Sequence, residues 1–555
     1  MGTKRVGGSV ARADGRRAVG RRRWGALLPI AAVAALLLAT SCTDTRGRVT
    51  AFGEVVEIVA LDNSFNPPVV VIAPGTTVRW INKGRLSHNS LVVTGDAAFG
   101  VAEADFAPGS SHEFTFTKVG EYSYFCSLHG TKDSGMTGKI IVSATPGSVD
   151  TSVSTQPPDT RASAGGGAVH RVPDDYKTIQ AAVDASKPDD MVLIAKGTYH
   201  EAVKVKTDNI VIRGEDRNET VLDGEFKLDN GFLVSAANGV AIENMTAMNY
   251  KVNGFFWTGV QGYRGSYLTA VRNGDYGIYA FDSQHGQFDH SYGSGSPDAG
   301  FYIGQCNPCD ALITDSFAEG NGLGYSGTNA TDLVIVRSTF RNNRAGIVPN
   351  SGSYEKLAPE GKTTIIGNTV YGNSRSDLPA IDAALLVQGS GIISAGGIDN
   401  IIERNLVFDH DKGGILLLGF PEGETVWDVT GNRVKDNVVS DSRVADLAMV
   451  TKDTNLGNCF AGNTFKTSSP LDLEKLAPCT GKGTGDITAG NKGLAGFITN
   501  QNPPSVDYRT MPDAPSQTTM PDATSARWLP ASPGNLPTIK VDLDALEVPS
   551  RPAGA

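Results

Sequence analysis

Residues 254–280 read GFFWTGVQGYRGSYLTAVRNGDYGIYA and contain one full period of the repeat that decides the fold of most of this chain. Gly254 and Gly277 are 23 residues apart, and each opens a short apolar segment. The same spacing links Gly231 to Gly254 and Gly277 to Gly300, and the pattern continues at Gly324, Gly346, Gly391 and Gly414. Fixed periods of this length are typical of solenoids, in which each repeat forms one coil.

A period of 23 residues, at about 3.3 Å per residue, is enough for three short strands and three turns. We expect each glycine to supply a left-handed or tight backbone conformation before its strand. Asparagines such as Asn249, Asn273, Asn321 and Asn342 are expected at turns. The 65 glycines and the low aromatic content of 7% also favour a turn-rich, all-β protein.

A short helix is expected at the start of this region, because Ile179, Ala182 and Val183 fall on one helical face. After it comes PDDMVLIAKGTYHEAVKV (residues 188–205). This stretch resembles the opening of pectate-lyase-like and nitrous-oxide-reductase-accessory β-helix proteins. The resemblance covers roughly residues 171 to 485 and implies a right-handed parallel β-helix, which we place at 169–487. The remaining 488–555 is an irregular, Pro-rich tail.

The segments before the solenoid have different compositions. Residues 51–143 alternate short apolar strands with turn signals, which suits a small β-sandwich. Residues 144–168 are rich in Pro, Ser, Thr and Gly and predict a linker, and 42–50 form a short polar tether. Because the linker has no apolar stripe, we expect few contacts between the two β domains and independent folding of each.

Residues 1–41 predict an export signal, because a basic segment precedes an apolar run that is too short to span a membrane comfortably. The run ends in Ala39-Thr40-Ser41-Cys42, which resembles a bacterial lipobox and implies lipidation of Cys42. Ala39 departs from the leucine usual at its position, so a plain secretory signal and an uncleaved anchor remain alternatives. We expect an extracytoplasmic protein attached to the cell membrane by a lipid.

Loss of residues 1–41 leaves 41 Lys and Arg against 58 Asp and Glu, a net charge of −17. Such a charge disfavours binding to nucleic acid and to anionic glycans. In an oxidising compartment, Cys459–Cys479 is expected as a disulfide. Cys306 and Cys309 form a second disulfide, two free thiols or a redox pair, and a zinc site of all four cysteines is a rival interpretation.

The sandwich region carries a set of possible copper ligands. Cys126 and His129 lie three residues apart, Met136 follows, and His88 comes 38 residues before Cys126. Two imidazoles and a thiolate form the plane of a type 1 (blue) copper site, with a thioether as the weak axial ligand. Read alone, Cys126 and His129 are equally consistent with a buried thiol beside an incidental histidine, and Met136 with core filling.

This region also resembles the plastocyanin/azurin cupredoxin family, through YSYFCSLH (residues 122–129) and SFNPPVVVIAPGTTVRWIN (residues 64–82). The resemblance implies a Greek-key β-sandwich that binds one type 1 copper through His88, Cys126, His129 and Met136. It leaves open whether the domain transfers single electrons to an unknown redox partner or stores or delivers copper.

The solenoid region offers only weak candidates for catalysis. Asp275 and Asp298 occupy equivalent positions in successive coils, where two carboxylates could hold Ca²⁺ or share a proton. The segment from Asp282 to His290 adds acids and histidines that could act as general acid and base in a lyase or epimerase. These candidates are Asp282, His285, Asp289 and His290. Polar turn residues explain both groups equally well, so enzymatic activity stays undecided.

The leading hypothesis is a membrane-anchored copper protein for electron transfer, with the β-helix as a binding platform. A carbohydrate-active β-helix enzyme with an accessory copper domain, acting on a polysaccharide, is the alternative. The resemblance to accessory proteins of nitrous oxide reductase implies copper handling or maturation as a third role.

Overall fold

The computed structural model describes residues 42–43, 48–50, 55–95, 97–132, 134–144, 167–451, 455–498 and 503–555. These residues belong to one compact unit, Ser41–Ala555. The expected signal (1–41) and most of the expected linker (144–168) lie outside the described residues. Within the described part of the chain, no helix is both long and apolar enough to cross a membrane.

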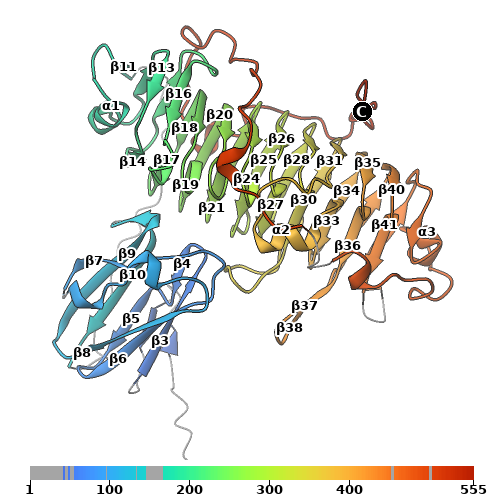
Figure 1. Ribbon diagram of the computed structural model, residues 1–555, viewed down its shortest axis with the longest axis horizontal. Coiled ribbons are helices and arrows are strands. Elements are labelled where there is room, and N and C mark those ends of the chain that lie inside the picture. Colours follow the sequence, from blue (N-terminus) through green and yellow to red (C-terminus); the bar gives the residue numbers. More distant parts are fainter. Residues whose placement is uncertain are drawn as a thin grey trace, which may run out of the picture. The chain divides into compact units, whose positions relative to one another are not determined.

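The first domain is a sandwich of two sheets (Figure 1). One sheet has the order β1-β2-β5-β10-β9-β7 and the other β4-β3-β6-β8. The strands are β1 Cys42–Thr43, β2 Arg48–Thr50, β3 Val55–Leu61, β4 Ser64–Asn66, β5 Val69–Ile72, β6 Thr76–Asn82, β7 Leu91–Thr94, β8 Ser111–Phe116, β9 Gly120–Thr131 and β10 Ser134–Val142, with 3-10 turns η1 Ala97–Phe99 and η2 Glu103–Asp105.

Buried and solvent-facing side chains alternate along the strands, and the inward-facing ones pack between the two sheets. Along β6, Val78 and Trp80 point inward and their neighbours face outward. The Trp80 ring meets Phe99 and Tyr124 of the sandwich core, with ring centroids 6.2 and 5.6 Å away. The prediction of a small β-sandwich is therefore confirmed.

The second domain is the expected parallel β-helix, with three short strands in each regular coil (Figure 1). One sheet of 11 strands contains β14 Val203–Val205, β17 Asn230–Ser235, β19 Asn253–Thr258, β21 Ile278–Phe281, β24 Ala299–Gly304, β27 Leu323–Thr328, β30 Ala345–Asn350, β33 Ser390–Ala395, β36 Gly413–Leu418, β41 Ala445–Val450 and β43 Ser468–Ser469.

The remaining strands of the coils form a bent sheet of 20 strands. They are β11 Val169–Val172, β12 Met191–Ile194, β13 Gly197–Tyr199, β15 Val211–Gly214, β16 Thr220–Asp223, β18 Val240–Met248, β20 Gln261–Val271, β22 Gln284–Asp289, β23 Tyr292–Ser294, β25 Ala311–Thr314, β26 Phe317–Glu319, β28 Leu333–Val336, β29 Thr339–Arg341, β31 Thr364–Ile366, β32 Thr369–Tyr371, β34 Ile401–Glu403, β35 Leu406–His410, β39 Arg433–Lys435, β40 Val438–Ser442 and β42 Cys459–Ala461. Strands β37 Phe420–Glu422 and β38 Thr425–Trp427 form a separate hairpin.

Helix α1 (Ile179–Ala185) closes the first coil, as the sequence predicts. The Thr178 side chain caps it by accepting a hydrogen bond from the Ala181 N–H, and Ile179, Ala182 and Val183 are buried. Two further short helices are α2 Asp382–Val387 and α3 Leu473–Leu476. The disulfides Cys306–Cys309 and Cys459–Cys479 are both formed, and Cys126 is a buried free cysteine.

The periodic glycines are needed for a different reason from the one expected. None of the eight has a positive φ. A Cβ on Gly254 would instead lie 2.7 Å from the Gly277 carbonyl oxygen, and one on Gly231 would lie 2.5 Å from the Gly254 oxygen. The glycines therefore permit close contact between successive coils. Asn249 and Asn342 are left-handed turn residues, but Asn273 and Asn321 instead accept backbone N–H bonds from a neighbouring coil.

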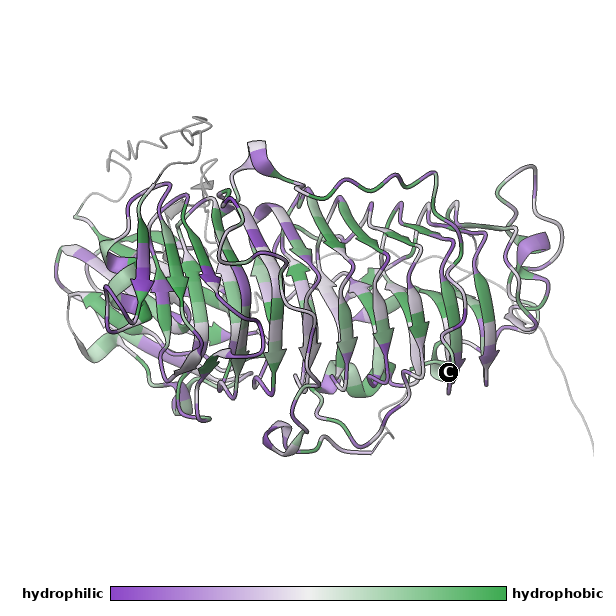
Figure 2. Cartoon of the chain, turned by 90° about the horizontal axis from the view of Figure 1, so that it is seen from above, coloured by the Kyte–Doolittle hydropathy of each residue, from purple (hydrophilic) through white to green (hydrophobic). Residues whose placement is uncertain are grey.

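Figure 2 shows hydrophobic colour along the stacked strands, with an irregular segment of chain crossing them. The C-terminal tail (residues 503–555) has no strand but lies against the 20-stranded sheet. Trp528 and Ala531 pack over Met191 and Leu193. The described part of the tail contains two 3-10 turns, η5 Tyr508–Thr510 and η6 Pro533–Asn535. A third turn, η4 Leu494–Gly496, precedes the tail.

Contacts between the two β domains correct the expectation that few would exist, while independent folding of each domain stays a prediction. Arg85 of the sandwich forms ion pairs with Asp62 (2.9 Å) and with Asp298 of the β-helix (3.8 Å). Its guanidinium also lies 4.3 Å from the centre of the Tyr354 ring. The Asn63 amide donates to the Tyr279 hydroxyl over 2.5 Å. The composition of the linker did not predict these contacts, because the residues that make them lie elsewhere in the chain.

Candidate metal centre

The candidate copper ligands come from a loop and a hairpin of the sandwich. His88 lies in the loop between β6 and β7, Cys126 and His129 lie in β9, and Met136 lies in β10. In the β9–β10 ladder, Gly130 pairs with Gly135 and Phe125 with Thr137. Residues 126–129 therefore bulge opposite Met136, and this bulge turns Cys126 and His129 toward the same interior point.

Three donor atoms converge there. The Cys126 sulfur lies 3.8 Å from His88 Nδ1 and 3.5 Å from His129 Nδ1, and the two imidazole nitrogens are 3.1 Å apart. A point equidistant from these atoms lies about 2.0 Å from each, close to metal–imidazole bond lengths. Among the described His, Cys, Asp and Glu residues, this is the group that could hold a metal ion.

Burial prepares the donors for a metal. It lowers the pKa of His88 to about 4 and, with the nearby His88 ring, lowers the pKa of His129 well below its usual value. Both imidazoles are therefore neutral at pH 7 and can donate lone pairs. Burial also raises the pKa of the Cys126 thiol to about 11, so metal binding at neutral pH would release its proton. Bound copper would supply a one-electron couple at this position.

Two asparagines that the sequence analysis missed hold the ligand segments in place. Buried Asn82 donates to the carbonyls of Leu86 (2.8 Å) and Phe106 (2.9 Å), and so orders the loop before His88. Asn89 donates to Ser127 Oγ (3.0 Å) and accepts from the Ser127 N–H (2.9 Å). The residue after His88 is thus tied to the residue after Cys126. Asn82 and Asn89 could have been found from the sequence, because both lie close to the ligand His88 and polar residues near a metal ligand often orient it. Met136 is fully buried in the same hydrophobic cluster as Cys126.

Asp275 and Asp298 do adjoin each other in successive coils, with the Asp298 N–H donating to the Asp275 carbonyl. They are buried, however, and Asp298 accepts from the Tyr276 hydroxyl (2.7 Å) and faces Arg85. Burial, together with the charge of Asp298, raises the pKa of Asp275 well above its usual value. These two acids therefore belong to the contact between the domains, where a polysaccharide does not reach them.

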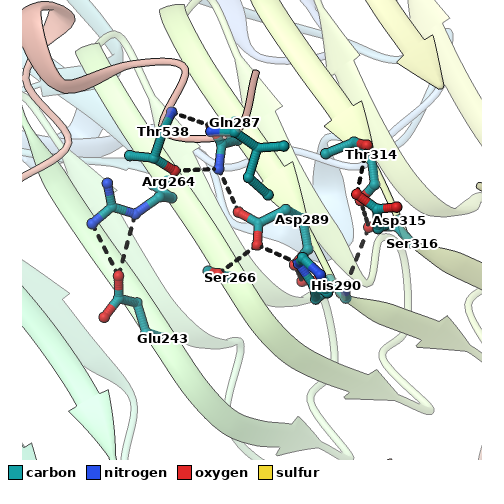
Figure 3. Close-up of polar contacts among 12 residues, drawn as sticks. Glu243, Arg264, Ser266, Gln287, Asp289, His290, Thr314, Asp315, Ser316 and Thr538 are labelled. Atoms are coloured by element: carbon teal, nitrogen blue, oxygen red, sulfur yellow. Dashed lines mark hydrogen bonds and ion pairs between the residues drawn. The ribbon is translucent and has the colours of Figure 1, made fainter. Parts of the chain in front are cut away.

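The segment from Asp282 to His290 is divided by strand β22. Asp282 is at an exposed turn, and His285 pairs with Asp310 over 2.7 Å. At the other end, buried Asp289 accepts from Ser266 Oγ (2.6 Å), Gln287 Nε2 (2.5 Å) and His290 Nδ1 (2.8 Å) (Figure 3).

His290 is the half-exposed member of that cluster. Its ring stacks on Tyr267 with centroids 4.5 Å apart, and the hydrogen bond to Asp289 raises its pKa. Tyr267 comes from the preceding coil, so no short motif in the sequence links it to His290. Asp289 holds His290 through Nδ1. A histidine oriented by a carboxylate in this way can act as a general acid or base through its other ring nitrogen.

Parts of this chain match known protein families and relatives. Residues 55–143 match the family described as copper binding proteins, plastocyanin/azurin family, and residues 230–407 match the right handed beta helix region. The chloroplast plastocyanin of Tetradesmus obliquus is 38% identical over 85 residues, 14% of this chain and 57% of that protein. Plastocyanin of Scenedesmus fuscus is 36% identical over 85 residues, which make up 14% of this chain and 85% of that protein.

A comparison of solved structures gives a match over the β-helix part of the chain. The A-module of a mannuronan C-5 epimerase from Azotobacter vinelandii is 15% identical, with a TM-score of 0.40, over 53% of this chain and 95% of that one. The sandwich carries the stronger likeness, because the plastocyanin matches combine sequence identity with the placement of His88, Cys126 and His129. Through residues 55–143, this chain belongs to the plastocyanin/azurin family of copper-binding proteins, here joined to a right-handed parallel β-helix.

Proposed function

We propose that this protein is an exported electron-transfer protein that binds one copper ion at a type 1 site and uses its β-helix as a rigid binding platform. The observation that carries the proposal is the convergence of His88, Cys126 and His129 in a buried site, opposite Met136. A rigid sandwich keeps the ligand positions nearly unchanged between the two oxidation states, which favours fast electron exchange.

The N-terminal segment and the net charge are the basis for the proposed location and partners. The basic and apolar segment before Cys42 supports export and lipid attachment to the outer face of the cell membrane. The acidic charge after residue 41 argues against nucleic acid as a partner. The electron partner is a separate redox protein or a small donor, and copper storage or delivery is the competing use of the same site.

The test is copper loading of the soluble fragment that starts at residue 43. We expect one copper per chain, an intense visible absorption in the oxidised form and its reversible loss on reduction. A fragment that binds copper tightly but stays colourless and does not cycle would contradict electron transfer and favour storage or delivery.

A second function, carbohydrate modification by the β-helix, is favoured by one observation. Buried Asp289 orients His290, whose ring lies against Tyr267 on the outside of the coil. Such an arrangement can accept and return a proton. A neutral or weakly charged polysaccharide suits the acidic protein better than pectin or alginate.

This second function predicts a loss of glycan turnover in His290→Gln. If a glycan substrate is found by screening, the rate should fall by about 10²-fold or more, because the proton-transfer group is lost. His285→Gln is the matched control, since His285 also pairs with an aspartate but lies at the other end of β22. Equal rates in the wild type and both variants would remove His290 from any such reaction.

A further inference from the structure

The β-helix covers the end of the sandwich that carries the copper ligands. The Asn230 side-chain amide donates to the Leu128 carbonyl over 3.4 Å, and Val252 packs against the sandwich core. A Cβ added to Gly135 would lie 3.4 Å from Ser235 Oγ, so the two domains also meet on the other side of the ligand bulge. Only 2% of His129 is exposed. A large protein partner therefore cannot contact this ligand directly.

A cavity of about 240 Å³ remains open beside the covered ligands. Ser127, which follows Cys126 directly, forms its wall on the sandwich side, and residues of three β-helix coils form the rest. Its polar lining includes Ser127, Lys204, Lys227, Asp229, Asn230 and Lys251. This volume is below the usual range for drug-sized ligands, so the cavity suits a molecule of roughly ten heavy atoms.

The charged residues of the lining favour an anion. Three lysines face a single aspartate there. Lys251 pairs with Asp229 (2.6 Å) and Lys227 with Glu225 (3.3 Å), whereas Lys204 forms no ion pair within the described residues. This positive charge contrasts with the acidic protein as a whole, so it would attract a small anion to this one place. Ser127 and Asn230 add hydrogen-bonding groups.

We propose that this cavity binds a small organic anion that donates one electron to the copper site, an enediol or catechol anion in chemical class. This inference rests on the proposed electron transfer and specifies its donor. The donor gives up one electron and one proton and leaves as a radical. With copper bound, the Ser127–Cys126 backbone would carry the electron from the cavity to the oxidised metal, and the donor's proton would go to solvent.

Binding can be tested without any redox reaction. Benzoate, a redox-inert organic anion, should bind the copper-free full-length chain in calorimetry at constant ionic strength. Replacing Lys204, Lys227 and Lys251 together by glutamine should weaken that binding about tenfold. The matched control is Lys196→Gln, because Lys196 has a similar exposed fraction to Lys251 (49% against 46%) and also forms an ion pair, with Glu219. Benzoate binding of equal strength in all three proteins would overturn the proposal.

Reduction kinetics then test the role of the cavity. With the copper-loaded chain, the rate of reduction by ascorbate should saturate with concentration, and benzoate should slow it competitively. In the triple variant, the second-order rate constant for reduction by ascorbate should be about tenfold lower than in the wild type. The rate constant for reduction by the cationic hexaammineruthenium(II) should not fall. Two outcomes would contradict a donor site. One is a reduction rate that rises linearly with ascorbate concentration and is the same in the variant. The other is an equal fall of the rate constants for both reductants in the variant.

Failure of this inference can be distinguished from failure of the proposed function. A blue, reversibly reducible protein without benzoate binding refutes only the cavity proposal. A colourless protein refutes the type 1 site, whatever the cavity binds.

Discussion

Cys126→Ser is expected to abolish the intense visible absorption of the copper-loaded protein. The colour depends on charge transfer from a thiolate in the plane of the metal, and a serine oxygen cannot supply it. Copper affinity should fall as well, because the remaining His88 and His129 nitrogens are 3.1 Å apart and provide only two strong donors. Absorption spectroscopy with metal analysis measures both effects.

Met136→Leu serves as the companion variant. In the proposed type 1 site the methionine sulfur would be the weak fourth ligand, and a buried leucine is close to methionine in volume. The colour should therefore persist while the reduction potential rises, since the loss of a sulfur donor disfavours Cu(II). A variant at Cys126 that kept its full blue absorption would refute the ligand assignment.

Arg85→Met is expected to destabilise the full-length protein by about 3–5 kcal/mol, because it leaves buried carboxylates without their cation. Arg85 is the positive charge shared by Asp62 of the sandwich and Asp298 of the β-helix. Asp62 and Asp298 are 1% and 0% exposed, so solvent does not replace the lost charge. Urea denaturation followed by tryptophan fluorescence can measure the loss, since Trp80 and Trp257 report on the two domains.

Arg79→Met is the matched control for this prediction. Arg79 lies in the same domain and pairs with Glu57 (3.2 Å) and Glu113 (2.5 Å), but all three side chains are exposed. Exposed ion pairs contribute little to stability, so this variant should unfold at nearly the wild-type urea concentration. If Arg85→Met behaved in the same way, the contact between the domains would not be energetically significant.

Much of the fold and the copper site could be predicted because the deciding residues are close together or regularly spaced. Cys126 and His129 share one short segment, and the glycine period is visible without any knowledge of the structure. The prediction that these glycines adopt a left-handed conformation was wrong. Spacing alone cannot distinguish a residue with a positive φ from one that the next coil contacts closely.

The contact between the domains could not be predicted for a related reason. Arg85 and Asp298 are separated by more than two hundred residues, and neither stands out in its local sequence. Asp298 was noticed only for its position beside Asp275, which suggested a metal or proton site. Tyr267 and His290 are only 23 residues apart, one coil of the repeat, but stacked rings in successive coils leave no short motif either.

The C-terminal tail changes how the solenoid should unfold. In an isolated array of coils, each coil is stabilised by its immediate neighbours, and the ends can fray separately. Here Trp528 donates to the Asp189 carbonyl (3.1 Å) near the first coils, Arg404 donates to Leu543 (2.8 Å), and Arg551 pairs with Asp441 (3.5 Å) near the last. A single covalent segment therefore joins distant coils, and the β-helix should lose its structure in one cooperative transition rather than by progressive fraying.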